Sequence, residues 1–240
     1  MKKVLTYFSI KYKGDWEKVY EAIDSKEHIN KKYVDDFVSR IDIETVTLVD
    51  DNYPKELKQI FKPPFALFIA GNKDLINNDK LFMISLMDIE IMDKKNHFNF
   101  SKDLNEILFV VDFNNEGIIR NLIKNNLKFI AISRKGIMNI KNNSLYSDIV
   151  LSNNLIISES YDYEGESRNF YFDRLFVGLS RRTLFMNYIE KDKYPLLSVL
   201  TNESIPIFSF KEKKANSFKL IKIKSIKILK ELVCWVSKIS

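Results

Sequence analysis

The chain has 240 residues, of which 45% are hydrophobic and 29% are charged, so it can bury a core of ordinary size. Its single cysteine, Cys234, excludes an internal disulfide and a cysteine-clustered zinc site. The N-terminal apolar run breaks at Ser9 and Lys11, too early for a secretory signal, and no stretch approaches the ~20 apolar residues that span a bilayer. We therefore expect a cytoplasmic protein that does not cross a membrane.

The net charge of +6 is concentrated in one segment. Residues 211–230 contain eight lysines and one glutamate, a local charge of +7, so the rest of the chain sums to −1. A polyanionic partner, either nucleic acid or an anionic membrane surface, fits such a charge. Alternatively, the lysines protect a solvated edge of the fold from aggregation.

Residues 1–44 are predicted to form a small helical module. Apolar residues recur at helical spacing in three stretches, at residues 4–10, 16–23 and 31–41. Gly14 and Asp15 mark a turn between the first two helices. The aromatic residues of this module are interpreted as core, with an exposed, base-stacking Trp16 as the alternative.

The next segment alternates short strands with turns. Strands are predicted at residues 45–49, 65–70 and 81–86, with a Pro-started helical turn at 54–60. Gly71 stops the second of these strands. Residues 88–102 are polar and poorly periodic, which predicts a loop with at most a short helix.

From residue 107 onwards, apolar strands alternate with amphipathic helices. Strands are predicted at 107–111, 128–133, 155–158 and 183–189, with a last strand ending at Phe210, and helices at 118–125, 145–151, 169–180 and after Tyr194. Continuous apolar strands between helices predict an α/β fold with a Rossmann-like, doubly wound, mostly parallel sheet. The expected domains are the helical module (1–44), a Rossmann-like domain (45–210) and a lysine-rich C-terminal segment (211–240).

Ligands of such sheets bind outside the carboxyl ends of the strands. That rule directs attention to the residues that follow the predicted strands, at 112–117, 133–136, 158–163 and 187–193.

Three motifs in this chain resemble the DprA (Smf) family of DNA-processing proteins. The run from Tyr53-Pro54 through Pro63-Pro64 to Gly71-Asn72 matches the family pattern YPxxLxxIxDPPxxLFxxGN, except that Lys62 replaces the usual Asp. Ile157-Ser158-Glu159 matches a short strand end, and the run from Arg174 to Gly178-Leu179-Ser180 matches the family's RNRIIAGLS helix. The resemblance extends from about residue 45 to 210.

The departures from the family pattern lie in the ligand-binding loops. Ile84-Ser85-Leu86-Met87 stands where a VGSR-like turn is usual, without its Gly or Arg. In the loop that aligns with SGxARGID, Gly117 and Ile118 remain, but Glu116 replaces the phosphate-facing Arg. This change reverses a charge that would otherwise contact a phosphate.

The resemblance implies a binding protein without catalytic residues, cofactor or metal. Family members bind single-stranded DNA in a basic pocket, load the RecA recombinase onto it and dimerise through the Rossmann-like domain, so single-stranded DNA, RecA and a second copy are the expected partners, and DNA uptake or recombination the expected process. Residue by residue, the resemblance carries over Gly117, Arg174, Gly178 and Ser180 as expected DNA-binding residues. Positive charge adds expected contacts to a nucleic-acid backbone at Arg181, Arg182, Lys219, Lys222, Lys224 and Lys227.

Several of these residues also have a structural interpretation. Arg174 can pair with Asp173 or Glu159 and hold its helix against the sheet, and Gly117 can be a turn or helix-start glycine. Arg181 and Arg182 can interact with a helix C-terminal dipole. In the tail, residues 218–224 predict a basic strand followed by an amphipathic helix, which fits phosphates, a membrane surface or docking onto the body of the protein.

Two other functions remain open. A scaffold that has lost DNA binding but keeps its protein contacts is suggested by Glu116. A nucleotide-monophosphate hydrolase is the enzyme alternative, but residues 188–199 lack the PGGxGTxxE motif of those relatives. Separately, Glu159 and Asp162 are candidate general acid and base carboxylates, at a spacing that is common and not specific.

Overall fold

The computed structural model describes residues 1–78, 82–87, 100, 102–165, 170–180, 182–185, 206–209 and 220–222. Its helices are α1 (Lys2–Lys11), α2 (Trp16–Asp24), α3 (Lys31–Ser39), α4 (Glu116–Lys124), α5 (Ile137–Ile140), α6 (Ser144–Leu151) and α7 (Phe170–Ser180), with the 3-10 turns η1 (Leu57–Gln59), η2 (Lys73–Leu75) and η3 (Lys102–Leu104). Its strands are β1 (Glu44–Thr47), β2 (Ala66–Gly71), β3 (Phe82–Met87), β4 (Ile107–Asp112), β5 (Lys128–Ser133), β6 (Leu155–Ser158), β7 (Thr183–Phe185), β8 (Ile207–Ser209) and β9 (Leu220–Lys222).

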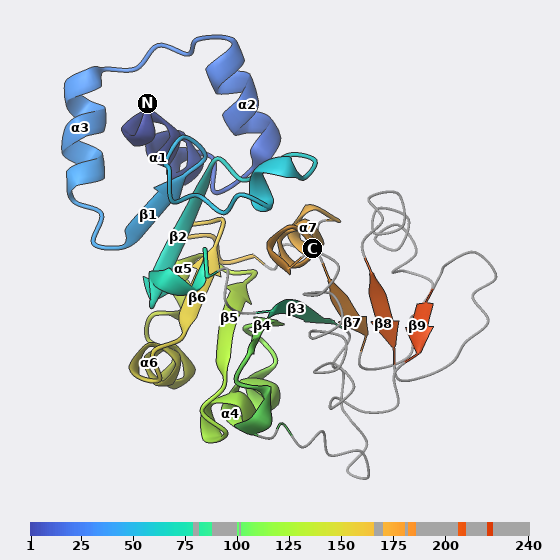
Figure 1. Ribbon diagram of the computed structural model, residues 1–240. Helices are drawn as coiled ribbons and strands as arrows, with labels where there is room; N and C mark the ends of the chain where they lie inside the picture. Colours follow the sequence, from blue (N-terminus) through green and yellow to red (C-terminus); the bar gives the residue numbers. More distant parts are fainter. Residues whose placement is uncertain are drawn as a thin grey trace.

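These strands form one nine-stranded sheet in the order β1-β2-β6-β5-β4-β3-β7-β8-β9 (Figure 1). All pairs from β6 to β9 are parallel, whereas β2 is antiparallel to β6 and β1 is antiparallel to β2. The chain moves outward from β3 to β6 and then returns to β7 on the other side of β3. The predicted Rossmann-like, mostly parallel sheet is therefore confirmed, with an antiparallel pair added at one edge.

Apolar side chains cover both faces of the sheet, which explains the continuous apolar strands. On β4, Val110 packs in the cluster that contains Leu175 of α7, and Phe109 packs in the cluster that contains Ile119 of α4 and Leu145 of α6. Alternate residues of a strand point to opposite faces, so α7 lies on one face and α4 and α6 on the other (Figure 1).

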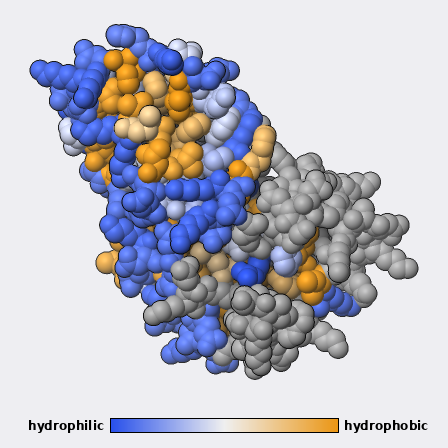
Figure 2. Space-filling model, turned by 45° about the horizontal axis from the view of Figure 1, so that its top comes forward, coloured by the Kyte–Doolittle hydropathy of each residue, from blue (hydrophilic) through white to orange (hydrophobic). Residues whose placement is uncertain are grey.

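The three predicted N-terminal helices are confirmed, and two of them begin at side-chain caps. The Asp15 carboxylate accepts a hydrogen bond from the Lys18 N–H at 3.2 Å, and the Asn30 amide oxygen accepts one from the Tyr33 N–H at 3.1 Å. In Figure 2 a large apolar area lies over this helical module, whereas the surface beneath it is mainly hydrophilic.

Trp16 is a packing residue that joins the module to the sheet. Its ring stacks on Tyr20 at 5.1 Å and on Phe65 at 5.2 Å, and its indole N–H donates a hydrogen bond to the Pro63 carbonyl at 2.9 Å. The interpretation of the module's aromatic residues as core holds only in part, because Trp16 is half-buried and lines a cavity, and Tyr20 and Tyr33 are exposed.

Gly71 ends β2 with a left-handed backbone, at φ 101°. A Cβ on this residue would come within 2.1 Å of the Asn154 carbonyl oxygen, beside the start of β6. Glycine is therefore required here both by the backbone conformation and by the close antiparallel neighbour.

The sheet continues past residue 210, because β9 pairs in parallel with β8. The basic strand predicted in the tail is thus present at residues 220–222, where Ile221 and Lys222 are exposed. The predicted helices after Tyr194 and at the C-terminus, and most of the predicted loop at 88–102, lie outside the described residues. None of the described helices has the length and apolar character needed to span a bilayer.

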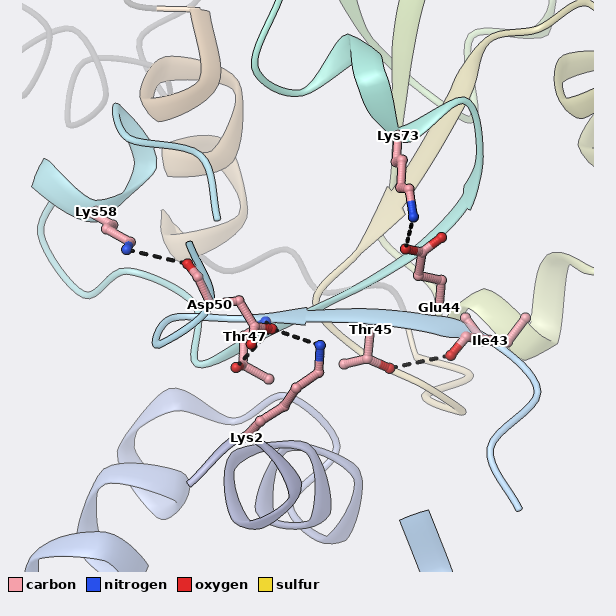
Figure 3. Close-up of polar contacts among 8 residues, drawn as sticks. All are labelled: Lys2, Ile43, Glu44, Thr45, Thr47, Asp50, Lys58 and Lys73. Carbon is pink, nitrogen blue, oxygen red and sulfur yellow. Dashed lines mark hydrogen bonds and ion pairs between the residues drawn. The ribbon is translucent and has the colours of Figure 1, made fainter. Parts of the chain in front are cut away.

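Asp50 connects the end of β1 to α1 (Figure 3). Its carboxylate accepts hydrogen bonds from the Thr47 N–H at 2.8 Å and the Thr47 hydroxyl at 3.1 Å, and it pairs with Lys2 at 2.9 Å. Partial burial by itself raises the pKa of Asp50, but the Thr47 N–H and Lys2 outweigh it and the pKa is lowered overall.

We expect Asp50→Asn to destabilise the protein by roughly 1–2 kcal/mol at pH 7, because it removes a charged acceptor. Because the pKa of Asp50 is lower in the folded protein, its carboxylate stabilises the fold at pH values above the unfolded-state pKa of about 3.9. This stabilisation is lost as the pH falls through the folded-state pKa. Chemical denaturation at pH 7 and pH 3 should therefore show the mutant converging on the wild type in acid. The exposed Lys73–Glu44 pair provides the control, since Glu44→Gln should change stability little at either pH.

Candidate nucleic-acid interface

A cavity of about 420 Å³ lies between the N-terminal module and the sheet. Residues 11–18, which form the turn from α1 to α2, line one side. The carboxyl ends of β5 and β6 line the other side with Ser133, Arg134 and Ser158, and α7 adds Arg174. This is the edge of the sheet to which the sequence pattern directed attention. The contribution of the helical module to it was not predicted.

The turn of the module lies directly on the end of β6. Gly14 has φ 78°, and a Cβ there would come within 2.8 Å of the Glu159 carbonyl oxygen. The adjacent Lys13 is also left-handed, at φ 54°. The cavity is thus closed on one side by a turn whose backbone shape depends on glycine.

Arg174 is nearly buried and forms an ion pair with Glu159. Its Nη2 lies 2.6 Å from Glu159 Oε1, and its Nε donates a hydrogen bond to the Lys62 carbonyl at 2.7 Å. Burial raises the pKa of Glu159, and the Arg174 guanidinium opposes that rise. Of the two interpretations of Arg174, the structure shows the pair with Glu159, and this pair holds α7 against β6 and the Lys62 loop.

Lys62, which replaces the family's usual Asp, connects this pair to the module. Its backbone is left-handed at φ 55°, a conformation that Asp and Asn adopt more readily than Lys. Its ammonium forms an ion pair with Glu17 of α2 and lies 5.1 Å from the centre of the Trp16 ring. With Lys62 in place of the family's usual Asp, the loop therefore contacts the helical module through Glu17 and the Trp16 ring.

Gly178 lies against the family's Tyr-Pro motif and not at the surface. A Cβ at this position would come within 2.7 Å of both Leu57 and Ile60. Gly178 therefore lets α7 approach η1 closely. Both motif segments thus pack on each other inside the protein, and a DNA contact at Gly178 stays a prediction that no observation tests.

Ser180 is also an interior residue, only 2% exposed. Its hydroxyl lies 2.7 Å from the Ser85 hydroxyl and 2.8 Å from the Phe176 carbonyl, and it donates to the Arg182 carbonyl at 2.6 Å. Ser85 itself belongs to β3 and not to a turn. Ser180 thus ties the end of α7 to the sheet, and its expected DNA contact stays a prediction, as at Gly178.

Gly117 is the second residue of α4, which supports its interpretation as a helix-start glycine. A Cβ there would meet no atom within 4 Å, so the backbone does not require glycine. Glu116 forms an ion pair with Arg120 at 2.7 Å, and Arg120 also pairs with Asp148 at 3.1 Å. The loop that aligns with the family's phosphate-binding loop therefore presents a carboxylate at this position.

The remaining predicted contacts lie elsewhere. Arg182 is half-buried, and burial lowers the pKa of its guanidinium. Lys222 is exposed on β9, five strands away from β5, a separation of about 24 Å at the usual strand spacing. Positions outside the described residues are Arg181, Lys219, Lys224 and Lys227. The cations expected at one site thus fall into separate regions.

Arg134 is a candidate residue that the sequence did not single out. It follows β5 directly, lines the cavity, and its Nε lies 2.8 Å from the Asp112 carboxylate at the end of β4. Its position immediately after a predicted strand was the available signal. In the part of the chain that the structure describes, no group of three or more His, Cys, Asp or Glu side chains could hold a metal ion.

Residues 44–192 match the protein family described as DNA recombination-mediator protein A, and this match covers more than half of the chain. The chain belongs to this family. The resemblance stated from the three motifs is therefore confirmed. No curated protein matches the chain.

Two solved structures resemble this member of the recombination-mediator family. DNA processing protein A (DprA) from Streptococcus pneumoniae has a TM-score of 0.61 at 19% identity, covering 90% of this chain and 80% of that one. DNA processing protein A from Helicobacter pylori, solved for its single-stranded DNA binding mode, has a TM-score of 0.49 at 15% identity, covering 82% of this chain and 98% of that one. The first comparison shows a shared fold.

Proposed function

We propose that this protein binds single-stranded DNA and passes it to a RecA-type recombinase during DNA uptake or recombination. The observation that carries this proposal is the match of residues 44–192 to the DNA recombination-mediator family. The protein acts by binding, in the cytoplasm, without covalent chemistry or a cofactor. A homodimer is the expected assembly.

Two basic regions support binding to a polyanion. One is the cavity wall with Lys13 and Arg134, and the other is the lysine-rich segment that begins before β9, of which Lys222 is exposed. Cations of this kind bind a nucleic-acid backbone without sequence preference and release its counterions.

Binding should therefore weaken steeply with salt. We expect Lys→Gln changes at Lys219, Lys222, Lys224 and Lys227 together to lower the affinity for a short oligonucleotide and to reduce the slope of log K against log salt by about 3, if each contacts one phosphate. Filter binding over a salt series measures both quantities.

A control variant with the same change in net charge distinguishes direct phosphate contacts of the tail lysines from a general electrostatic attraction between protein and DNA. Lys26 is exposed in the turn after α2, and Lys31, Lys32 and Lys124 are exposed on α3 and α4. Replacing these four lysines with Gln should leave the slope near the wild-type value. Equal losses in both quadruple variants would contradict a specific role for the tail. Failure of the wild type to retain any oligonucleotide at low salt would overturn DNA binding itself.

A scaffold without DNA binding is the second candidate, favoured by Glu116 in the loop where a phosphate-facing Arg is usual. A pull-down that retains RecA while filter binding retains no DNA would select it. Release of ribose 5-phosphate from nucleotides would instead support the enzyme alternative, whose diagnostic stretch at 188–199 lies outside the described residues.

A further inference from the structure

The helical module has an apolar face that is open to solvent. Figure 2 shows it as a large apolar area over the module. Its residues come from all three helices and from the segment between α2 and α3, and none of them is fully buried: Val4, Tyr7, Ile23, Ile29, Tyr33 and Phe37. We call these six residues the module face. A contiguous apolar surface of this kind marks a contact with another molecule.

Packing within the module joins these residues into one surface. The Tyr7 ring lies edge-on to Tyr33, with ring centroids 6.1 Å apart, and edge-on to Phe37 at 5.6 Å. The other three members of the module face pack, like Tyr7, on the small core around Phe8. Tyr33 nevertheless remains 57% exposed. A tyrosine in this position offers a large and rigid contact area at a low cost in conformational entropy.

The module carries no net charge, unlike the chain as a whole. Residues 1–44 contain nine basic and nine acidic side chains, whereas the full chain has a net charge of +6. Two lysines of α1 are paired within the module, Lys3 with Asp35 at 2.8 Å and Lys11 with Glu27 at 2.5 Å. The module face therefore fits a partner whose own contact surface is apolar and neutral.

A second copy of this chain meets that requirement. Around a twofold axis the same face is used by both copies, and a neutral apolar face is complementary to itself. The module lies beside β1, to which the Lys2–Asp50 pair joins it, and the lysine-rich segment contains β9 at the other edge of the sheet. These edges are eight strand spacings apart, about 38 Å, several times the Debye length of about 8 Å. A contact through the modules thus avoids repulsion between the two basic segments.

We infer that the module face is a contact between two copies of this chain. The inference rests on the proposed function in one respect, because it takes a homodimer as the assembly. It assigns that contact to a surface outside the Rossmann-like domain, and five-sixths of an interface residue set would not serve, so all six residues of the module face precede the family match at residue 44.

Sedimentation velocity over a concentration series tests this contact. Tyr33→Asp places a charge on the module face and should raise the dissociation constant of the contact roughly 30-fold, the effect of losing a central aromatic anchor. At a fixed concentration, the mass should fall to half that of the wild type or less. Added salt should not dissociate the wild type, because the contact is apolar.

Leu151→Asp is the matched control. Leu151 is 84% exposed at the end of α6, so this change adds the same charge at an exposed apolar residue outside the module, and the mass should stay that of the wild type. Circular dichroism checks that both variants are folded. Hydrogen exchange adds a measurement on the wild type itself: amides of α1 and α3 should lose protection on dilution, in step with the fall in mass.

The outcomes separate this inference from the proposed function. A wild-type assembly whose mass Tyr33→Asp leaves unchanged would overturn the inference and assign the homodimer to another surface. If Tyr33→Asp does not fold, protection of α1 and α3 that is independent of concentration would overturn it instead. A wild type that stays monomeric at every concentration would overturn both the inference and the homodimer, and would leave the module face to a different protein. Oligonucleotide binding is measured separately, and neither result changes it.

Discussion

Replacing Arg174 with Met should destabilise the protein by roughly 3–5 kcal/mol, because it leaves the buried Glu159 carboxylate without its cation. The hydrogen bond from Arg174 to the Lys62 carbonyl is lost as well. Chemical denaturation at pH 7 measures the loss of unfolding free energy. The slope of this free energy against denaturant concentration should be the same in the variant and in the wild type.

The effect should depend on pH in a direction that identifies its cause. Burial raises the pKa of Glu159, and removal of Arg174 takes away the interaction that opposes this rise. A carboxyl whose folded pKa is raised costs stability as pH increases from its unfolded value through its folded value. Arg174→Met should therefore be less destabilising at pH 5 than at pH 8.

A double variant separates the ion pair from the packing of Arg174. Glu159→Leu combined with Arg174→Met replaces both charges with apolar groups, so it should recover much of the stability lost in Arg174→Met alone. A double variant as unstable as the sum of both single changes would show that the two residues act independently, contrary to the pairing described above.

Gly178→Leu should be the second strongly destabilising change, costing about 3 kcal/mol or preventing folding altogether. Even a Cβ would come within 2.7 Å of Leu57 and Ile60, and a larger side chain would push α7 away from η1. Differential scanning calorimetry of the variant, with the yield of folded protein as a second readout, tests this expectation.

Gly117→Ala is the matched control for Gly178, since both glycines lie in helices. A Cβ at Gly117 has open space, and Ala favours a helix over Gly by up to about 1 kcal/mol. We expect Gly117→Ala to be neutral or stabilising. If both variants lost stability equally, close packing at Gly178 would not be the reason for its glycine.

The order and type of the elements followed closely from local patterns. Apolar residues at helical spacing predicted α1 to α3, and uninterrupted apolar runs predicted β4 and β5 within one residue of their observed ends. These predictions succeeded because a strand buried on both faces needs apolar side chains at every position. The antiparallel placement of β1 and β2 was not predicted, since pairing between distant segments leaves no local periodicity.

The candidate site was harder to predict, because the role of each residue depends on which other residues it contacts in three dimensions. Ser180 and Gly178 stand in a motif that implies binding, yet in the fold Ser180 bonds to β3 and Gly178 packs against η1, contacts that the motif does not reveal. Conversely, Lys13 is one of many lysines in the sequence, and only its position over the ends of β5 and β6 distinguishes it.

The sequence by itself determined the family and the mostly parallel α/β sheet, and it placed the main excess of positive charge in the tail. Those features depend on composition, on short-range periodicity and on motifs that are contiguous in the chain. Only the tertiary structure decided that the module lies on the sheet edge, that Arg174 is neutralised by Glu159, and that a cavity forms between them. Contacts between residues far apart in sequence arise from packing and charge pairing in three dimensions, which no local pattern records.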